Sequence, residues 1–109
     1  MEIVDVPDRS RVGRPPDESM TMLEGSYQIH GATITLVELR RYVERRDDRG
    51  AYSLITARIR AGPHLIEMIY DEGYRGEDAL ERAADFLRSQ MGVAGLVLRA
   101  VIAIRDAAG

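Results

Sequence analysis

From Glu24 onward, short runs of apolar and β-branched residues alternate with compact turn signals, a pattern typical of consecutive β-strands. The turn signals are Gly31-Ala32, Asp47-Asp48-Arg49-Gly50 and Ala61-Gly62-Pro63. The strands predicted around them are Tyr27–His30, Thr33–Arg46, Ala51–Arg60 and His64–Tyr70. Because the turns are short, neighbouring strands are expected to run antiparallel as a β-meander.

The second of these segments also fits a helix. Thr35 and Glu38 have the spacing of a capping box, and the apolar residues after them recur at helical spacing. Against a helix, the Asp-Asp-Arg-Gly turn lies between two runs of matching length, as a hairpin requires, and the β-branched Ile34 and Val37 favour a strand. We therefore predict a strand, with a helix over 36–46 as the alternative.

A helical pattern follows the fourth strand. The apolar stripe consists of Ala79, Leu80, Ala83, Ala84, Phe86, Leu87 and Met91. This spacing predicts an amphipathic helix over Glu77–Met91 that ends at Gly92. The next segment, Gly95–Asp106, alternates imperfectly with a period of two and predicts a last strand, whose apolar face would hold Leu96, Leu98, Ala100, Ile102 and Ile104. A second helix is the alternative, since the same residues also form a broad apolar helical face.

The resulting fold class is α+β: an antiparallel meander of about four strands, covered on one face by one amphipathic helix, with a C-terminal strand or second helix. The other face of the sheet is expected to be wet or available to a partner. Residues 1–22 contain three prolines and few apolar side chains, which predicts a flexible arm ahead of a single domain over 23–109. Within the arm, Ile3, Val4 and Val6 can add an edge strand.

Composition narrows the function classes. A chain of 109 residues with 45% hydrophobic and 30% charged residues suits one globular domain, and no apolar run approaches the roughly 18 residues needed to span a bilayer. We expect a cytoplasmic protein that does not bind membranes. Cysteine is absent, which excludes disulfides, thiolate nucleophiles and cysteine-based metal sites. All 15 basic residues are arginines, and lysine and asparagine are missing, which indicates a GC-rich genome.

Charge is segregated along the chain. Residues 38–60 carry seven arginines and four acidic residues, a net charge of +3, whereas residues 64–85 carry two arginines and seven acidic residues, a net charge of −5. Arginine and tyrosine are enriched at interface hot spots, so the basic hairpin is a candidate binding surface. Its candidate contact residues are Arg40, Arg41, Arg45, Arg46, Arg58 and Arg60, with Tyr42 and Tyr52.

These features favour a non-catalytic binding module that acts through protein–protein contact, as a homo-oligomer or as a small regulator or inhibitor of a larger complex. The alternative is a nucleic-acid-binding domain that uses the arginine-rich hairpin, with Arg9, Arg11 and Arg14 of the arm adding phosphate contacts. The net charge of −3 argues against a surface devoted to nucleic acid.

Two weaker candidates concern small molecules. Arg75 and Gly76 precede the predicted helix, where backbone N–H groups can hold an anion. His30, His64 and Glu67 are the residues around which a small enzyme would be built. No spacing typical of a metal site, a phosphate loop or a dinucleotide fold is present, so we expect no metal and no cofactor.

Overall fold

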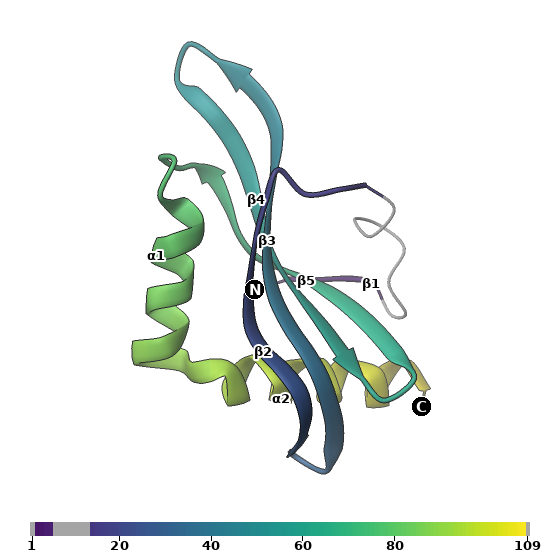
Figure 1. Cartoon of the computed structure of the whole chain (residues 1–109). Helices are drawn as coiled ribbons and strands as arrows, with labels where there is room; N and C mark the ends of the chain where they lie inside the picture. The colour runs from purple at the N-terminus through teal and green to yellow at the C-terminus, as the bar shows by residue number, and fades with distance from the viewer. Residues whose placement is uncertain (1, 6–13, 109) are drawn as a thin grey trace.

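The computed structural model describes residues 2–5 and 14–108 and contains five strands and two helices (Figure 1). The strands are β1 (Glu2–Asp5), β2 (Glu18–Ile29), β3 (Ala32–Asp47), β4 (Gly50–Ala61) and β5 (His64–Tyr74). The helices are α1 (Ala79–Phe86) and α2 (Gly92–Ala108), joined by a π-helical turn, η1 (Leu87–Met91). The fold is therefore α+β, as the sequence predicts.

All five strands belong to one antiparallel sheet in the order β1-β5-β4-β3-β2. The predicted four-strand meander is confirmed as β2 to β5, and the segment 36–46 is strand rather than helix. Its hairpin partner explains the choice: β3 and β4 pair from Asp47↔Gly50 to Ile34↔Ala61, with register shifts between Val43 and Arg45 and between Ile34 and Leu36.

The N-terminal region departs from the predicted arm. β2 begins at Glu18 rather than Tyr27, and β1 pairs with β5 through Glu2↔Ile69 and Ile3↔Met68. The predicted edge strand is therefore present over Glu2–Asp5, whereas Val6 lies outside the described residues. More than half of the residues of β2 are exposed, as suits an edge strand, although Met20, Met22 and Leu23 pack against the core.

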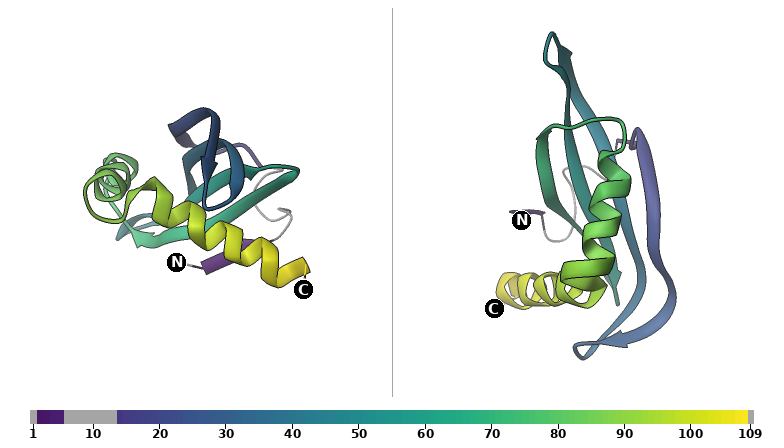
Figure 2. Two further views of the ribbon diagram at one scale, coloured as in Figure 1. Left: turned by 90° about the horizontal axis from the view of Figure 1, so that it is seen from below. Right: turned by 90° about the vertical axis from the view of Figure 1, so that its left-hand side faces the viewer.

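The predicted helix over Glu77–Met91 is present as α1 and η1. Gly92 then adopts a φ of 78°, and the chain turns through 93° into α2 (Figure 2). The predicted last strand over Gly95–Asp106 is therefore wrong, and the alternative of a second helix is correct. Within the described chain, no single helix is long and apolar enough to cross a bilayer, although the bent pair Ala79–Ser89 and Gly92–Asp106 passes that test by length and composition when taken together.

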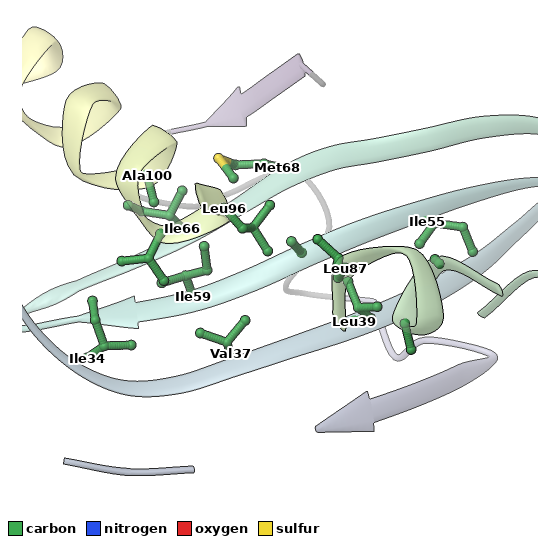
Figure 3. Packing of buried hydrophobic residues seen from close by; sticks show 14 of the residues in the cluster. Ile34, Val37, Leu39, Ile55, Ile59, Ile66, Met68, Leu87, Leu96 and Ala100 are labelled. Atoms are coloured by element: carbon green, nitrogen blue, oxygen red, sulfur yellow. The ribbon is translucent and has the colours of Figure 1, made fainter. Parts of the chain in front are cut away.

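The apolar core lies between one face of the sheet and the helices (Figure 3). Its buried members include Ile34, Val37 and Leu39 from β3, Ile59 from β4, Ile66 and Met68 from β5, Leu87 from η1, and Leu96 and Ala100 from α2. In β5 the side chains of Ile66 and Met68 point to the core, so Glu67 between them points to the other face.

That other face is not free at its centre, contrary to expectation. Tyr42, Thr56 and Glu67 are fully buried there, and Arg40 is only 7% exposed. The Glu67 carboxylate accepts hydrogen bonds from Arg40 Nη1 at 3.4 Å and from Tyr42 Oη at 3.2 Å. The middle of the sheet therefore has an apolar core on one face and a buried charged network on the other.

Candidate functional site

The β3–β4 hairpin extends beyond the ends of the other strands and of α1 (Figure 1). It contributes to a long molecular axis of 45 Å, against 28 and 19 Å for the other two. Every residue from Glu44 to Gly50 is exposed. The hairpin end is thus presented to solvent, away from the body of the domain.

The turn at this end is fixed by local chemistry. Asp47 Oδ1 accepts a hydrogen bond from the backbone N–H of Arg49 at 2.9 Å, which is the Asx-turn arrangement favoured by aspartate. Gly50 has a φ of 115°, a backbone conformation that residues with a side chain rarely adopt. The predicted Asp-Asp-Arg-Gly turn is confirmed, and its residue types account for its shape.

Behind the turn lies a group of stacked side chains, which we call the tip cluster: Arg45, Arg49, Tyr52 and Tyr74, with Asp47. The Tyr52 and Tyr74 rings meet edge to face, with centroids 5.2 Å apart. The guanidinium of Arg45 lies 4.4 Å from the Tyr52 centroid, and that of Arg49 lies 4.5 Å from the Tyr74 centroid.

The Tyr74 hydroxyl ties this cluster to the turn. It donates to Asp47 Oδ2 and accepts from Arg49 Nη2 at 2.9 Å. Donation from Tyr74, followed by the Arg49 backbone N–H, holds the pKa of Asp47 below its ordinary value. The cluster therefore keeps an ionised carboxylate, two guanidinium groups and two aromatic rings in one fixed arrangement at neutral pH.

Two of the predicted contact arginines are not on the surface. Arg40 and Arg41 are consecutive strand residues, so their side chains point to opposite faces of the sheet. Arg40 pairs with Glu38 at 3.2 Å and with Glu67 at 3.4 Å. Arg41, only 2% exposed, donates to Ser53 Oγ at 3.2 Å and pairs with Glu18 and Glu77. Both side chains are buried in ion pairs within the fold, so neither is presented on the surface as the sequence-based prediction of partner contacts requires.

The remaining predicted residues are dispersed. Tyr42 is fully buried, and burial, followed by the charge of Glu67, raises the pKa of its hydroxyl to about 12. Arg58 is half-buried in register between Glu38 and Glu67, whereas Arg46 and Arg60 are exposed at opposite ends of the β3–β4 pair. Of the predicted set, Arg45, Arg46 and Tyr52 lie together at the hairpin end.

His30, His64 and Glu67 do not form a common site. His30 follows the last residue of β2 and His64 begins β5, so β3 and β4 lie between them and three strand spacings amount to about 14 Å. Glu67 is fully buried and paired with Arg40. Among the described residues, no group of three or more histidine or carboxylate side chains is arranged to hold a metal.

Arg75 and Gly76 lie in the connection from β5 to α1. The Arg75 guanidinium forms two hydrogen bonds with the Asp71 carboxylate, at 3.0 and 3.1 Å. Gly76 is exposed, and its carbonyl accepts from the backbone N–H of Ala79 at 3.1 Å. The predicted anion site at this loop is therefore already occupied in part by the chain's own carboxylate.

Sequence reasoning did not select Tyr74 or Arg49 for the tip cluster. Counting back from the β4–β5 turn places Gly73, not Tyr74, opposite Tyr52. One extra residue in β5 alters this: Thr56 pairs with Ile69 but Ile55 pairs with Asp71, so Tyr70 is bulged out and Tyr74 moves opposite Tyr52. Nothing in the sequence marks this bulge.

Comparison of the chain with protein-family models, with curated proteins and with solved structures finds no match.

Proposed function

We propose that this chain is a non-catalytic protein-binding module that docks the end of its β3–β4 hairpin onto another protein. The observation that carries the proposal is the tip cluster, in which two half-buried tyrosines brace two exposed arginines. Arginine and tyrosine are among the residue types that dominate binding energy at protein interfaces.

The fixed arrangement of the tip-cluster side chains favours tight binding to a partner. A long arginine side chain that is ordered on binding costs about 0.5–1.5 kcal/mol in lost freedom. Arg45 and Arg49 are already stacked on tyrosine rings, and Arg49 is hydrogen-bonded to Tyr74. Much of this ordering cost is therefore met during folding, so that contacts at the tip contribute more fully to association.

The charge of the hairpin end favours a protein partner over a nucleic acid. Residues 44–49 comprise three arginines and three acidic residues, a net charge of zero. Non-specific binding to nucleic acid depends on neutralising phosphates with several unpaired cations. Burial of Arg40 and Arg41 removes two more of the cations on which that alternative depended. Arg9 and Arg11 lie outside the described residues.

The proposal is tested by placing a photo-crosslinking amino acid at Arg46 and, as a control, at Glu81 in cells of the source organism. Both side chains are exposed, but Arg46 lies at the hairpin end and Glu81 lies on α1. We expect one discrete heterologous adduct from position 46 and none from position 81. The adduct identifies the partner, and its complex with the purified chain can then be measured directly.

In that purified complex, Arg45→Ala is compared with Arg60→Ala, which removes an exposed arginine from the other end of β4. A hot-spot arginine contributes about 2 kcal/mol or more, so Arg45→Ala should weaken binding by about 30-fold and Arg60→Ala should not. Equal effects of the two variants would exclude the tip as the binding site. Light scattering behind a sizing column, alone and with an oligonucleotide at low salt, identifies self-association or a salt-sensitive nucleic-acid complex if either is the true activity.

A further inference from the structure

A second surface lies on the helix side of the sheet, where β5, α1 and α2 meet around a cavity of about 430 Å³. This volume is within the roughly 300–1,000 Å³ typical of small-molecule sites. Its lining residues are Tyr70 and Asp71 from β5, Arg75 from the following loop, Ala79, Arg82, Ala83 and Phe86 from α1, and Arg99 from α2. Nothing in the tip cluster lines it.

One part of the cavity lining is apolar. Tyr70 and Phe86 approach each other with ring centroids 6.3 Å apart, beside the short side chains of Ala79 and Ala83. Phe86 is the one phenylalanine of the chain, yet it is 44% exposed. An exposed aromatic ring in a concave surface is typical of ligand sites, since a bound apolar group covers it.

The polar part of the lining is cationic, and its charge is only partly balanced within the chain. Arg75 is paired with Asp71 at 3.0 Å and Arg82 with Asp78 at 3.2 Å. Arg99 has no carboxylate partner among the described residues. One guanidinium of the lining therefore has no carboxylate partner within residues 2–5 and 14–108, which suits a ligand with a single negative charge.

We propose that this cavity binds a small organic acid whose carboxylate pairs with Arg99 and whose apolar body lies against Phe86 and Tyr70. Charge balance favours a monocarboxylate over a phosphate dianion, because two of the three arginines already have carboxylate partners. The apolar wall favours an acyl or aryl body over a hydrated inorganic ion. The site is separate from the proposed protein-binding tip, so either can fail without the other.

The test is an NMR titration of the ¹⁵N-labelled full chain with octanoate as the probe. We expect saturable shifts of backbone amides around Ala79, Ala83 and Arg99. Octylamine has the same chain with the opposite charge, acetate has the same head group without the chain, and inorganic phosphate tests for an unspecific anion site. All three are expected to bind much more weakly than octanoate.

The matched variants are Arg99→Gln and Arg105→Gln, which remove exposed arginines from the same helix, only the first of them in the cavity lining. Arg99→Gln should weaken octanoate binding by about tenfold or more, and Arg105→Gln should leave it unchanged. The proposal is overturned if octanoate causes no saturable shifts, if octylamine or phosphate binds as tightly as octanoate, or if both variants bind octanoate with the same affinity. The spectra themselves report whether each variant is folded.

Discussion

Leu96 and Leu98 provide the sharpest test of how the C-terminal segment packs. A strand over 95–106 would place both leucines on the same face, whereas α2 places Leu96 in the core, fully buried, and leaves Leu98 39% exposed. Leu96→Ala should cost about 2–5 kcal/mol, the range for a leucine removed from a core that cannot fully close the cavity. Leu98→Ala should cost clearly less, about 1 kcal/mol, because Leu98 is partly in contact with solvent and its removal leaves no closed cavity in the core. Leucine and alanine are both good helix formers, so propensity contributes little to either value.

Equilibrium urea unfolding followed by circular dichroism measures this difference. A chain of this length is expected to have a free energy of unfolding of about 5–15 kcal/mol, so both variants remain measurable over most of that range. With a slope of about 2 kcal/mol per molar urea, a 3 kcal/mol loss lowers the midpoint by about 1.5 M. Similar midpoints for Leu96→Ala and Leu98→Ala would refute the helical packing and restore the strand.

Two further predictions concern the buried network on the other face of the sheet. Glu67→Gln should lower the free energy of unfolding by about 3 kcal/mol, because it leaves the 8% exposed Arg40 side chain without one of its two carboxylates. The control Glu72→Gln changes an exposed residue of the same strand and should alter the free energy of unfolding by no more than about 0.5 kcal/mol. Equal urea midpoints for the two variants would contradict this prediction. Burial and the charge of Glu67 raise the pKa of Tyr42 to about 12, above the value of about 10 for an unfolded chain, so its contribution to stability is complete below about pH 10 and is lost as pH rises towards 12. Tyr42→Phe should therefore flatten the alkaline decline in stability measured by urea unfolding at stepped pH, and an unchanged decline would show that another group causes it.

The sequence predicts elements well where local chemistry and long-range pairing agree. The turn at Asp47 to Gly50 has its own stabilising hydrogen bond and joins two strands that pair along most of their length, so the strand prediction for 36–46 is correct despite a capping-box pattern. The last segment is predicted wrongly because apolar residues occur around most of its circumference. In such a segment, a period of two and a period of 3.6 are both satisfied, and only packing against the sheet selects the helix.

The candidate site is less accessible to sequence reasoning than the fold. Local charge suggested one basic hairpin surface, but consecutive strand residues point to opposite faces, so Arg40 and Arg41 are directed into two different buried environments. The tip cluster depends on Tyr74, which comes from β5. The pairing of Tyr74 with Tyr52 depends on the bulge at Tyr70 and not on the β4–β5 turn. The cavity likewise combines Tyr70, Phe86 and Arg99 from three elements, a convergence that only the tertiary fold produces.

The bulge at Tyr70 has a consequence for any chain related to this one by descent. The same extra residue that brings Tyr74 opposite Tyr52 also supplies an aromatic wall of the cavity beside Phe86. Deletion of Tyr70 would let Asp71 follow Ile69 in unbroken register, so Tyr74 would stay opposite Tyr52 while the aromatic wall of the cavity would be lost. The two surfaces can therefore be lost separately: a homologue without the bulged residue should keep the arginine–tyrosine stack and lack the aromatic wall of the proposed organic-acid site.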